Sequence, residues 1–266
     1  MQQEITQWEI YIHTVDHPPT ISGRVRILRG AYSPQLDVQR DVLVYLPPSY
    51  HQSTDQRYPV IYMQDGQNLF DAGTAFGGQE WHVDETMEQL ATEGIEAIIV
   101  APYHGGEQRI QEYNPFPHVW RGKGQLYLDW LRDTLKPQID RDFRTQPERE
   151  HTGILGSSMG GLISMYAYFH RSETFGFAGV MSPAFWIGSG AIYASLQDAP
   201  YIDGKIYLDN GSRETSARRM NALLIKKGYN PCGNLLYVVE QDAEHTESAW
   251  ARRMPDALRF LLGTTP

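Results

Sequence analysis

Residues 152–162 read Thr-Gly-Ile-Leu-Gly-Ser-Ser-Met-Gly-Gly-Leu, and this stretch decides which fold we expect. Its first four residues suit a buried strand, and residues 162–170 have the apolar period of a helix. Between them, Gly156-Ser157-Ser158-Met159-Gly160 matches G-x-S-x-G in the strand–turn–helix context that a nucleophile elbow requires. The glycines are needed because a Cβ two positions from the strained central residue would collide with the strand or helix. Ser158 is therefore the candidate nucleophile; the alternative is a Gly/Ser-rich turn without chemistry.

The chain after Tyr58 supplies a sheet in which such a turn can sit. Short, continuously apolar runs are each followed by a segment of helical period. Strands that are apolar on both faces belong in a parallel sheet covered by helices. The predicted strands are 59–63, 97–101, 152–155, 177–181, 205–208 and 235–239. The predicted helices are 85–92, 126–135 ending before Pro137, 162–170, 216–227 and 247–262.

Residues 1–57 follow a different pattern. Apolar and polar residues alternate in 9–13, 23–28 and 41–46, which predicts antiparallel strands. The chain has no internal repeat, no low-complexity segment and no Ser/Gly-rich linker. We therefore expect a single domain, 1–266, of the α/β class. Its mostly parallel, doubly wound sheet is built from the βα units of residues 58–266, is extended by the antiparallel strands of residues 1–57, and carries helices on both faces.

Composition excludes several classes of partner. The 266 residues are 41% hydrophobic, which is enough for a sizeable core. A net charge of −9 disfavours nucleic acid, because that binding relies on releasing counterions from phosphates. The apolar runs are strand-sized, so we expect no membrane span. The lone cysteine, Cys232, and an N-terminus without signal-peptide features favour a cytoplasmic setting. The oligomeric state stays open.

A serine nucleophile needs a base, and on this architecture the chain order is serine, acid, histidine. Only His170 and His245 follow Ser158. His170 lies along the helix that the nucleophile starts, about 18 Å away at about 1.5 Å per residue. His245 falls in the loop 241–246, between the last predicted strand and the last helix, where an imidazole reaches the carboxyl edge of the sheet. We expect His245 to be the base, and a surface loop histidine is the alternative.

The acid must hold the imidazole in the tautomer that accepts the serine proton. The loop 209–214 offers Asp209, which follows the strand directly, and Glu214, which lies further out. Asp209 suits an Asp-Asn-Gly turn and Glu214 suits the first turn of a helix, so each has a structural alternative. We favour Glu214 over Asp209. Three further carboxylates close to His245 in sequence remain possible: Glu240, Asp242 and Glu244.

Acyl transfer also needs donors where the carbonyl oxygen becomes negative. One should be the backbone N–H of Met159, the residue after the nucleophile. The second should come from the loop after the strand 60–63, which makes the N–H of Gln67 our choice. His104-Gly105-Gly106 imitates an oxyanion signature, but it follows the next strand, which should lie one position further from the nucleophile. We therefore interpret it as a look-alike.

Several segments together resemble a known family of esterases in the α/β-hydrolase superfamily. This family includes esterase D, feruloyl and acetyl-xylan esterases, enterobactin esterases and antigen 85-type mycolyltransferases. The likeness runs over residues 43–262. Its carriers are Tyr62-Met63-Gln64-Asp65-Gly66-Gln67-Asn68-Leu69-Phe70-Asp71, Arg109 with Glu112-Tyr113-Asn114-Pro115, residues 122–137, Arg144-Thr145, residues 156–162, Ser182-Pro183 with Trp186, and His245-Thr246-Glu247 with Trp250.

The resemblance implies an α/β-hydrolase fold with Ser158 as nucleophile and His245 as base. It also implies an acid from the loop after Leu208, and an oxyanion hole from the Met159 amide and the amide after Asp65-Gly66. One departure concerns the acid, because this chain has Ser212-Arg213-Glu214 where many relatives have an Asp, and some relatives work with a Ser-His dyad.

The substrate is constrained only in part. Residues 109–123 and 183–186 should line the pocket, and their aromatic side chains suit a sugar or aryl face, with loop packing as the alternative. Arg109 would pair either with an anionic substrate or with Glu112. The candidate substrate-binding residues are Asn68, Arg109, Tyr113, Trp120, Phe185 and Trp186.

We therefore expect a serine carboxylesterase that hydrolyses a small acyl ester of carbohydrate, aryl or siderophore type. Acyl transfer to an alcohol is an alternative, and so is a catalytically silent binding protein on a hydrolase scaffold. No metal or organic cofactor is implied, since the histidines lack the spacing of a helix-borne zinc site and there is no cysteine cluster.

Overall fold

A twisted nine-stranded sheet organises the part of the chain that the computed structural model describes, residues 8–13, 18–231 and 233–263. Its order is β1-β2-β3-β5-β4-β6-β7-β8-β9. The first three strands run antiparallel to their neighbours, and the pairs from β5 to β9 are parallel. The strands are β1 (Glu9–Ile10), β2 (Arg24–Ser33), β3 (Val38–Leu46), β4 (Val60–Met63), β5 (Ile98–Pro102), β6 (Thr152–Ser157), β7 (Phe177–Met181), β8 (Lys205–Gly211) and β9 (Leu235–Glu240).

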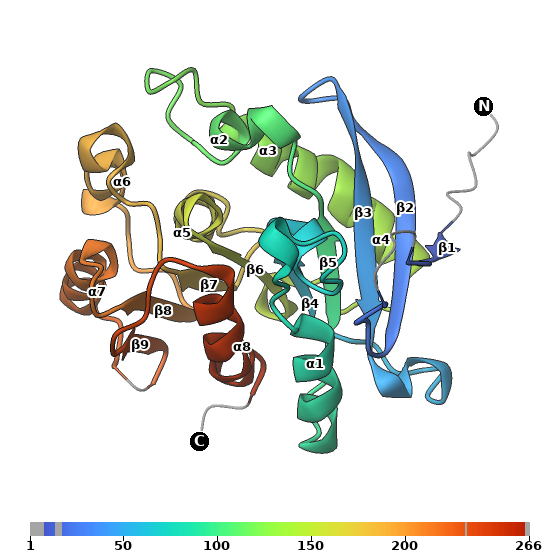
Figure 1. Cartoon of the computed structure of the whole chain (residues 1–266). Coiled ribbons are helices and arrows are strands. Elements are labelled where there is room, and N and C mark those ends of the chain that lie inside the picture. Colours follow the sequence, from blue (N-terminus) through green and yellow to red (C-terminus); the bar gives the residue numbers. More distant parts are fainter. Residues whose placement is uncertain (1–7, 14–17, 232, 264–266) are drawn as a thin grey trace.

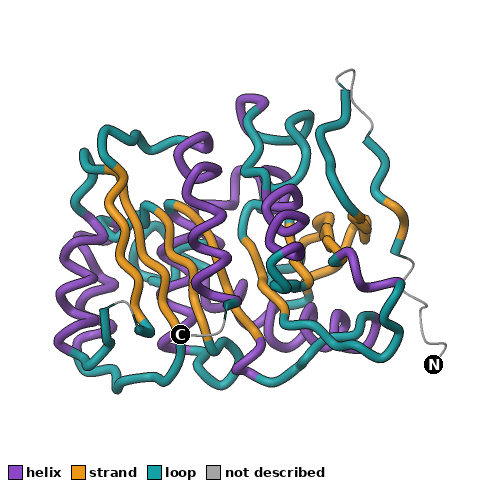
Figure 2. Tube along the Cα trace, turned by 90° about the horizontal axis from the view of Figure 1, so that it is seen from below, coloured by secondary structure: helices purple, strands orange, loops and turns teal. Residues whose placement is uncertain are grey.

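Helices cover both faces of this sheet (Figures 1 and 2). Because successive strand residues point to opposite faces, Val60 and Tyr62 of β4 join one core cluster while Ile61 and Met63 join the other. On the second face α1 and α8 lie side by side (Figure 1). The helices are α1 (Val83–Thr92), α2 (Arg109–Glu112), α3 (Gly124–Trp130), α4 (Lys136–Asp142), α5 (Met159–His170), α6 (Ile187–Gln197), α7 (Ser216–Lys226) and α8 (Glu247–Leu262).

The predicted α/β class with a mostly parallel sheet and antiparallel N-terminal strands is confirmed. In the described residues, no helix has the length and apolar character that crossing a membrane would require. Cys232 and residues 1–7, on which the expected redox setting and the reading of the N-terminus depended, lie outside the described residues.

Three helices differ from expectation, and the shortest of them, α2, was not predicted at all. The helix predicted to end before Pro137 continues into α4, because residues Leu131–Leu135 form a π turn in which the Lys136 N–H bonds to the Leu131 carbonyl. The wider turn places Pro137 at the start of a new α-helical segment, where a missing N–H is tolerated. The sequence pattern also missed α6, whose first turns contain Gly188, Ser189 and Gly190 at positive φ.

A buried ion pair fixes the long segment between β5 and α3 to the sheet. Arg40 on β3 donates two hydrogen bonds to the Glu112 carboxylate, at 2.8 and 2.9 Å. Both side chains are at most 2% exposed. One of our two expectations for Arg109, an ion pair with Glu112, is therefore wrong. Arg109 instead donates two hydrogen bonds to Asp65, at 2.6 and 2.7 Å.

Replacing Glu112 with Gln should lower the free energy of unfolding by roughly 3–5 kcal/mol, because it leaves the Arg40 guanidinium buried without a counter-charge. Urea unfolding followed by circular dichroism measures the loss. Glu107→Gln is the matched control, since Glu107 is an exposed carboxylate of the same segment. Equal unfolding midpoints for the two variants would show that the pair does not hold the segment.

Candidate active site

Ser158 occupies a strained turn between β6 and α5. Its backbone has φ 53° and ψ −116°, which a residue with a side chain adopts only when its surroundings enforce it. The Ser158 N–H donates to the Met181 carbonyl and the Ser158 carbonyl accepts from the Ala184 N–H, both at 2.9 Å. A Cβ on Gly156 would lie 2.7 Å from the Gly160 carbonyl carbon. Glycine at position 156 therefore avoids the steric collision on which we based the prediction of a nucleophile elbow.

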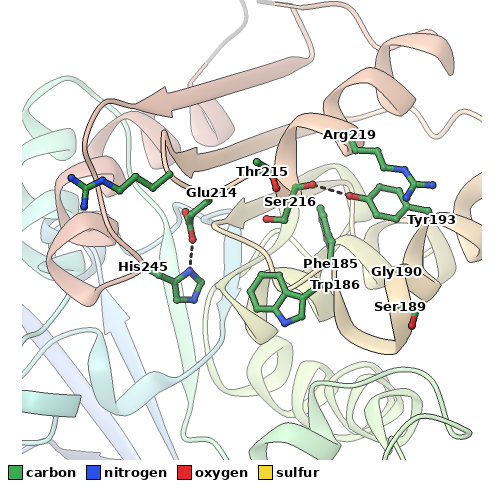
Figure 3. Close-up of a pocket in the computed structure, with 11 residues that line it drawn as sticks. Phe185, Trp186, Ser189, Gly190, Tyr193, Glu214, Thr215, Ser216, Arg219 and His245 are labelled. Carbon is green, nitrogen blue, oxygen red and sulfur yellow. Dashed lines mark hydrogen bonds and ion pairs between the residues drawn. The ribbon is translucent and has the colours of Figure 1, made fainter.

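His245 reaches the same edge of the sheet from the loop between β9 and α8, and its Nδ1 is hydrogen-bonded to Glu214 Oε1 (Figure 3). Glu214 lies in the loop between β8 and α7. The other carboxylates that we considered do not make this contact: Glu240 pairs with Arg252 and Arg253, and Glu244 pairs with Arg213. Between the two favoured acids, the geometry brings Glu214 rather than Asp209 to the imidazole.

Three donors hold the Glu214 carboxylate in place. Besides His245, the Ser182 hydroxyl donates to Glu214 Oε2 at 2.7 Å and the Gly211 N–H donates to it at 2.8 Å. Burial alone raises the pKa of Glu214, but these hydrogen bonds outweigh burial and lower the pKa to about 2. The group is therefore a carboxylate at any physiological pH, which is the state that an orienting acid needs.

Asp209 lies one layer deeper and supports Ser182. Its Oδ1 accepts the Ser182 N–H at 2.9 Å and forms an ion pair with Arg253 Nη1 at 3.2 Å. Arg253 Nη2 in turn donates to the Ser182 hydroxyl oxygen at 3.0 Å. Burial raises the pKa of Asp209 to about 6, against the opposing effect of Arg253. Sequence reasoning missed Arg253, because a lone arginine inside an amphipathic helix carries no signal of a buried role.

Ser158 and His245 line one cavity of about 500 Å³. The loop after β4 and the loop after β9 both contribute residues to this cavity. Asn68 and Arg109, two of the predicted substrate-binding residues, lie in its wall. Phe76, which the sequence analysis did not single out, is 74% exposed at this cavity. The full lining is Asp65, Gln67, Asn68, Phe76, His104, Arg109, Ser158, His245, Glu247 and Trp250.

Two backbone N–H groups are candidates for an oxyanion hole. Met159 is the first residue of α5, and N–H groups in the first turn of a helix have no partner within the helix. Gln67 lies in the turn after β4, which is the direct neighbour of β6. Gly66 brings this turn close to β5, since a Cβ there would lie 2.1 Å from the Ala101 carbonyl oxygen. The His104 segment follows β5, one strand further from β6, and His104 still lines the cavity.

His245 also lines a second cavity, of about 820 Å³ (Figure 3). Phe185, Trp186 and Tyr193 give it aromatic walls, and Trp186 packs edge-to-face on the His245 ring at 6.2 Å. Two arginines that the sequence analysis did not single out, Arg213 and Arg219, also line it. Predicted residues Phe185 and Trp186 thus lie where a substrate could reach them.

Two other predicted substrate-binding residues lie elsewhere. Tyr113 is fully buried, and its hydroxyl accepts the Asp65 N–H at 3.1 Å, so it supports the turn after β4 and lines neither cavity. Trp120 is 61% exposed at a positive φ of 48° and also lines neither cavity. Aromatic composition of a loop could not distinguish these positions from Trp186, because the fold of the loop decides which rings turn inward.

Comparisons with known proteins identify the family and the fold of this chain. The family model described as "Putative esterase" matches residues 33–261. The chain is 26% identical over 257 residues to the uncharacterised protein YbbA of Bacillus subtilis, covering 89% of this chain and 98% of that one. It is 28% identical over 143 residues to an endo-1,4-beta-xylanase/feruloyl esterase of Xylanibacter ruminicola, covering 52% of this chain but only 19% of that protein.

Solved structures show the same fold. The enterochelin esterase of Shigella flexneri superposes with a TM-score of 0.70 at 18% identity, covering 93% of this chain and 60% of that one. At this identity the likeness establishes the fold alone, and the family match supplies the class of reaction. The chain belongs to the "Putative esterase" family and is a carboxylic ester hydrolase.

Proposed function

We propose that the chain is a serine carboxylesterase that works through an acyl-enzyme on Ser158, with His245 as base and Glu214 as the acid that orients it. One observation carries the proposal: the residue in the strained turn shares a cavity with a histidine whose Nδ1 is bonded to a carboxylate. Binding alone requires no such combination, whereas nucleophilic catalysis does.

In this mechanism Ser158 Oγ attacks the ester carbonyl while His245 Nε2 takes the hydroxyl proton. The Met159 and Gln67 N–H groups stabilise the oxyanion that forms. The carbon–oxygen bond to the alcohol then breaks, and the imidazolium gives its proton to the leaving alkoxide. Water attacks the acyl-enzyme by the same steps and releases the acid. Glu214 stabilises the imidazolium in both halves without taking up a proton.

We propose an aromatic ester as the substrate. The aromatic walls of the larger cavity support this choice, because aryl groups pack well on rings and lose little entropy. Arg219 lies over the Tyr193 ring at 3.9 Å, and with Arg213 it adds positive charge near which a phenolic or carboxylate group would be favoured. The matched relative named as a feruloyl esterase is consistent with an aryl substrate.

Mutation of the nucleophile tests the mechanism. Ser158→Ala and His245→Ala should each lower kcat for p-nitrophenyl acetate on the order of 10⁴- to 10⁶-fold, and the burst of p-nitrophenol should disappear from Ser158→Ala. Stopped-flow absorbance measures both quantities, and methyl ferulate serves as the aryl substrate in parallel. An unchanged burst in Ser158→Ala would place the acyl group elsewhere.

The assignment of the acid has its own test. Glu214→Gln should lower kcat about 10²- to 10⁴-fold, less than loss of the nucleophile, because the serine and imidazole remain. Asp209→Asn is the comparison variant. Because Asp209 acts on Glu214 only through Ser182, we expect its kcat to fall by no more than about tenfold. The reverse order of the two variants would transfer the acid role to Asp209.

The low pKa of Glu214 predicts how stability depends on pH. A carboxyl group whose pKa falls from 4.5 to about 2 on folding stabilises the protein above pH 4.5 and loses this contribution as the pH falls toward 2. Ser182→Ala removes one donor, so the Tm difference from the wild type should shrink as the pH falls from 4.5 to 2. Ser189→Ala is the control, because it changes another serine of the cavity that Glu214 lines, and it should show no such trend. A difference for Ser182→Ala that is independent of pH would contradict this explanation.

A further inference from the structure

Three potential metal ligands meet at the start of α1, away from both cavities. They are Glu80, His82 and Glu85, and one donor atom from each lies within 4.8 Å of the others. His82 Nδ1 is 3.8 Å from Glu80 Oε1 and 3.7 Å from Glu85 Oε1. None of the three residues lines the cavities that contain Ser158 and His245. The esterase mechanism therefore gives no reason for this arrangement.

Glu80 is the unusual member of this group. Its side chain is 1% exposed, and neither of its carboxylate oxygens has a hydrogen-bond partner in the described part of the chain. A buried carboxylate without a partner is strongly unfavourable unless a cation compensates it. Glu80 Oε1 lies 3.8 Å from His82 Nδ1, so the unpartnered carboxylate faces the cluster.

A neighbouring carboxylate strengthens the demand for positive charge. Asp84 is fully buried, and its Oδ2 accepts the Ser22 N–H at 2.6 Å, while its Oδ1 has no partner among the described residues. Glu80 lies just before α1, and Asp84 and Glu85 lie in its first turn. Residues 80–85 thus contain three carboxylates, with His82 as the one nitrogen ligand of the cluster. A bound divalent cation would relieve this repulsion.

We propose that Glu80, His82 and Glu85 bind one Zn²⁺ ion. An imidazole with two carboxylates is a donor set that zinc accepts, and the two negative charges match the charge of the ion. Zinc bonds to N and O of about 2.0–2.2 Å place tetrahedral ligand atoms roughly 3.3–3.6 Å apart. The two carboxylate oxygens lie slightly further than this from His82 Nδ1, at 3.8 and 3.7 Å. Small rotations of the half-exposed His82 and of Glu85 would close that gap, and solvent would supply the fourth ligand.

The position of this site gives it a structural role. Trp81 lies between two of the ligands in sequence, is fully buried, and packs edge-to-face against Trp250 with ring centroids 5.5 Å apart. Trp250 packs in the same way on the His245 ring at 5.0 Å. Bound zinc would therefore stabilise the segment that leads into α1. Through the Trp81 and Trp250 rings it would also stabilise the packing against His245, the proposed base. It would not touch the ester.

Calorimetric titration of the full-length chain with ZnCl₂, after dialysis against EDTA, tests the site. We expect one Zn²⁺ per chain and a higher Tm for the zinc-loaded protein. Glu80→Gln and His82→Ala should each weaken binding at least about tenfold, because even the loss of a group that only supports a metal ligand costs about that much. The controls are His51→Ala and Glu107→Gln, which remove an exposed histidine and an exposed carboxylate elsewhere and should bind zinc as the wild type does.

The readout does not depend on esterase activity, so failure of the catalytic proposal would leave it intact. His82→Ala alters a half-exposed side chain, which keeps the test valid if Glu80→Gln fails to fold by circular dichroism. Absence of stoichiometric binding by the wild type would overturn the proposal. So would zinc binding that both ligand variants retain, or binding of Mn²⁺ in preference to Zn²⁺ by the same residues.

Discussion

The close approach of α5 to β6 is the constraint on which the site depends. A side chain at Gly156 would meet Gly160 and Gln64, so only glycine lets the helix start directly above the strand. The backbone then has room for one turn, and that turn leaves Ser158 at positive φ with its side chain at the carboxyl edge of the sheet. Packing of α5 against β6 and β7 offsets the strain, because a buried helix contributes far more stability than one strained residue costs.

Electrostatics at this edge follow from burial in two layers. The upper layer is Glu214, whose three donors keep it ionised beside His245. The lower layer is Asp209 with Arg253, a buried pair that holds Ser182 where it can donate upward. Because Ser182 and Gly211 both donate to Glu214 Oε2, the other oxygen, Oε1, is left to accept the hydrogen bond from His245. Each layer removes rotational freedom from the one above it, and this preorganisation is what an orienting acid requires.

The second region of interest is the start of α1, where the buried Glu80 carboxylate has no hydrogen-bond partner among the described residues. Where Glu214 has all its hydrogen bonds, Glu80 has none, although both are carboxylates shielded from solvent. The protein itself supplies the hydrogen bonds of Glu214, whereas Glu80 would need a bound cation to compensate its charge. The indole pair of Trp81 and Trp250 joins the two regions through ring contacts, so a cation at α1 would act on packing rather than on chemistry.

Sequence periodicity and one pentapeptide determined much of this protein. The apolar runs predicted the parallel strands because two-sided burial leaves an unmistakable pattern, and the chain order of the elbow selected His245 from nine histidines. Pro137 misled the helix assignment, since a π turn is invisible in a pattern of 3.6 residues. Only tertiary structure decided that Glu214 rather than Asp209 contacts His245, that Tyr113 is buried while Trp186 lines a cavity, and that Glu80 lacks a partner. These outcomes depend on distances between segments far apart in the chain, and such distances are set by packing rather than by local residue preference.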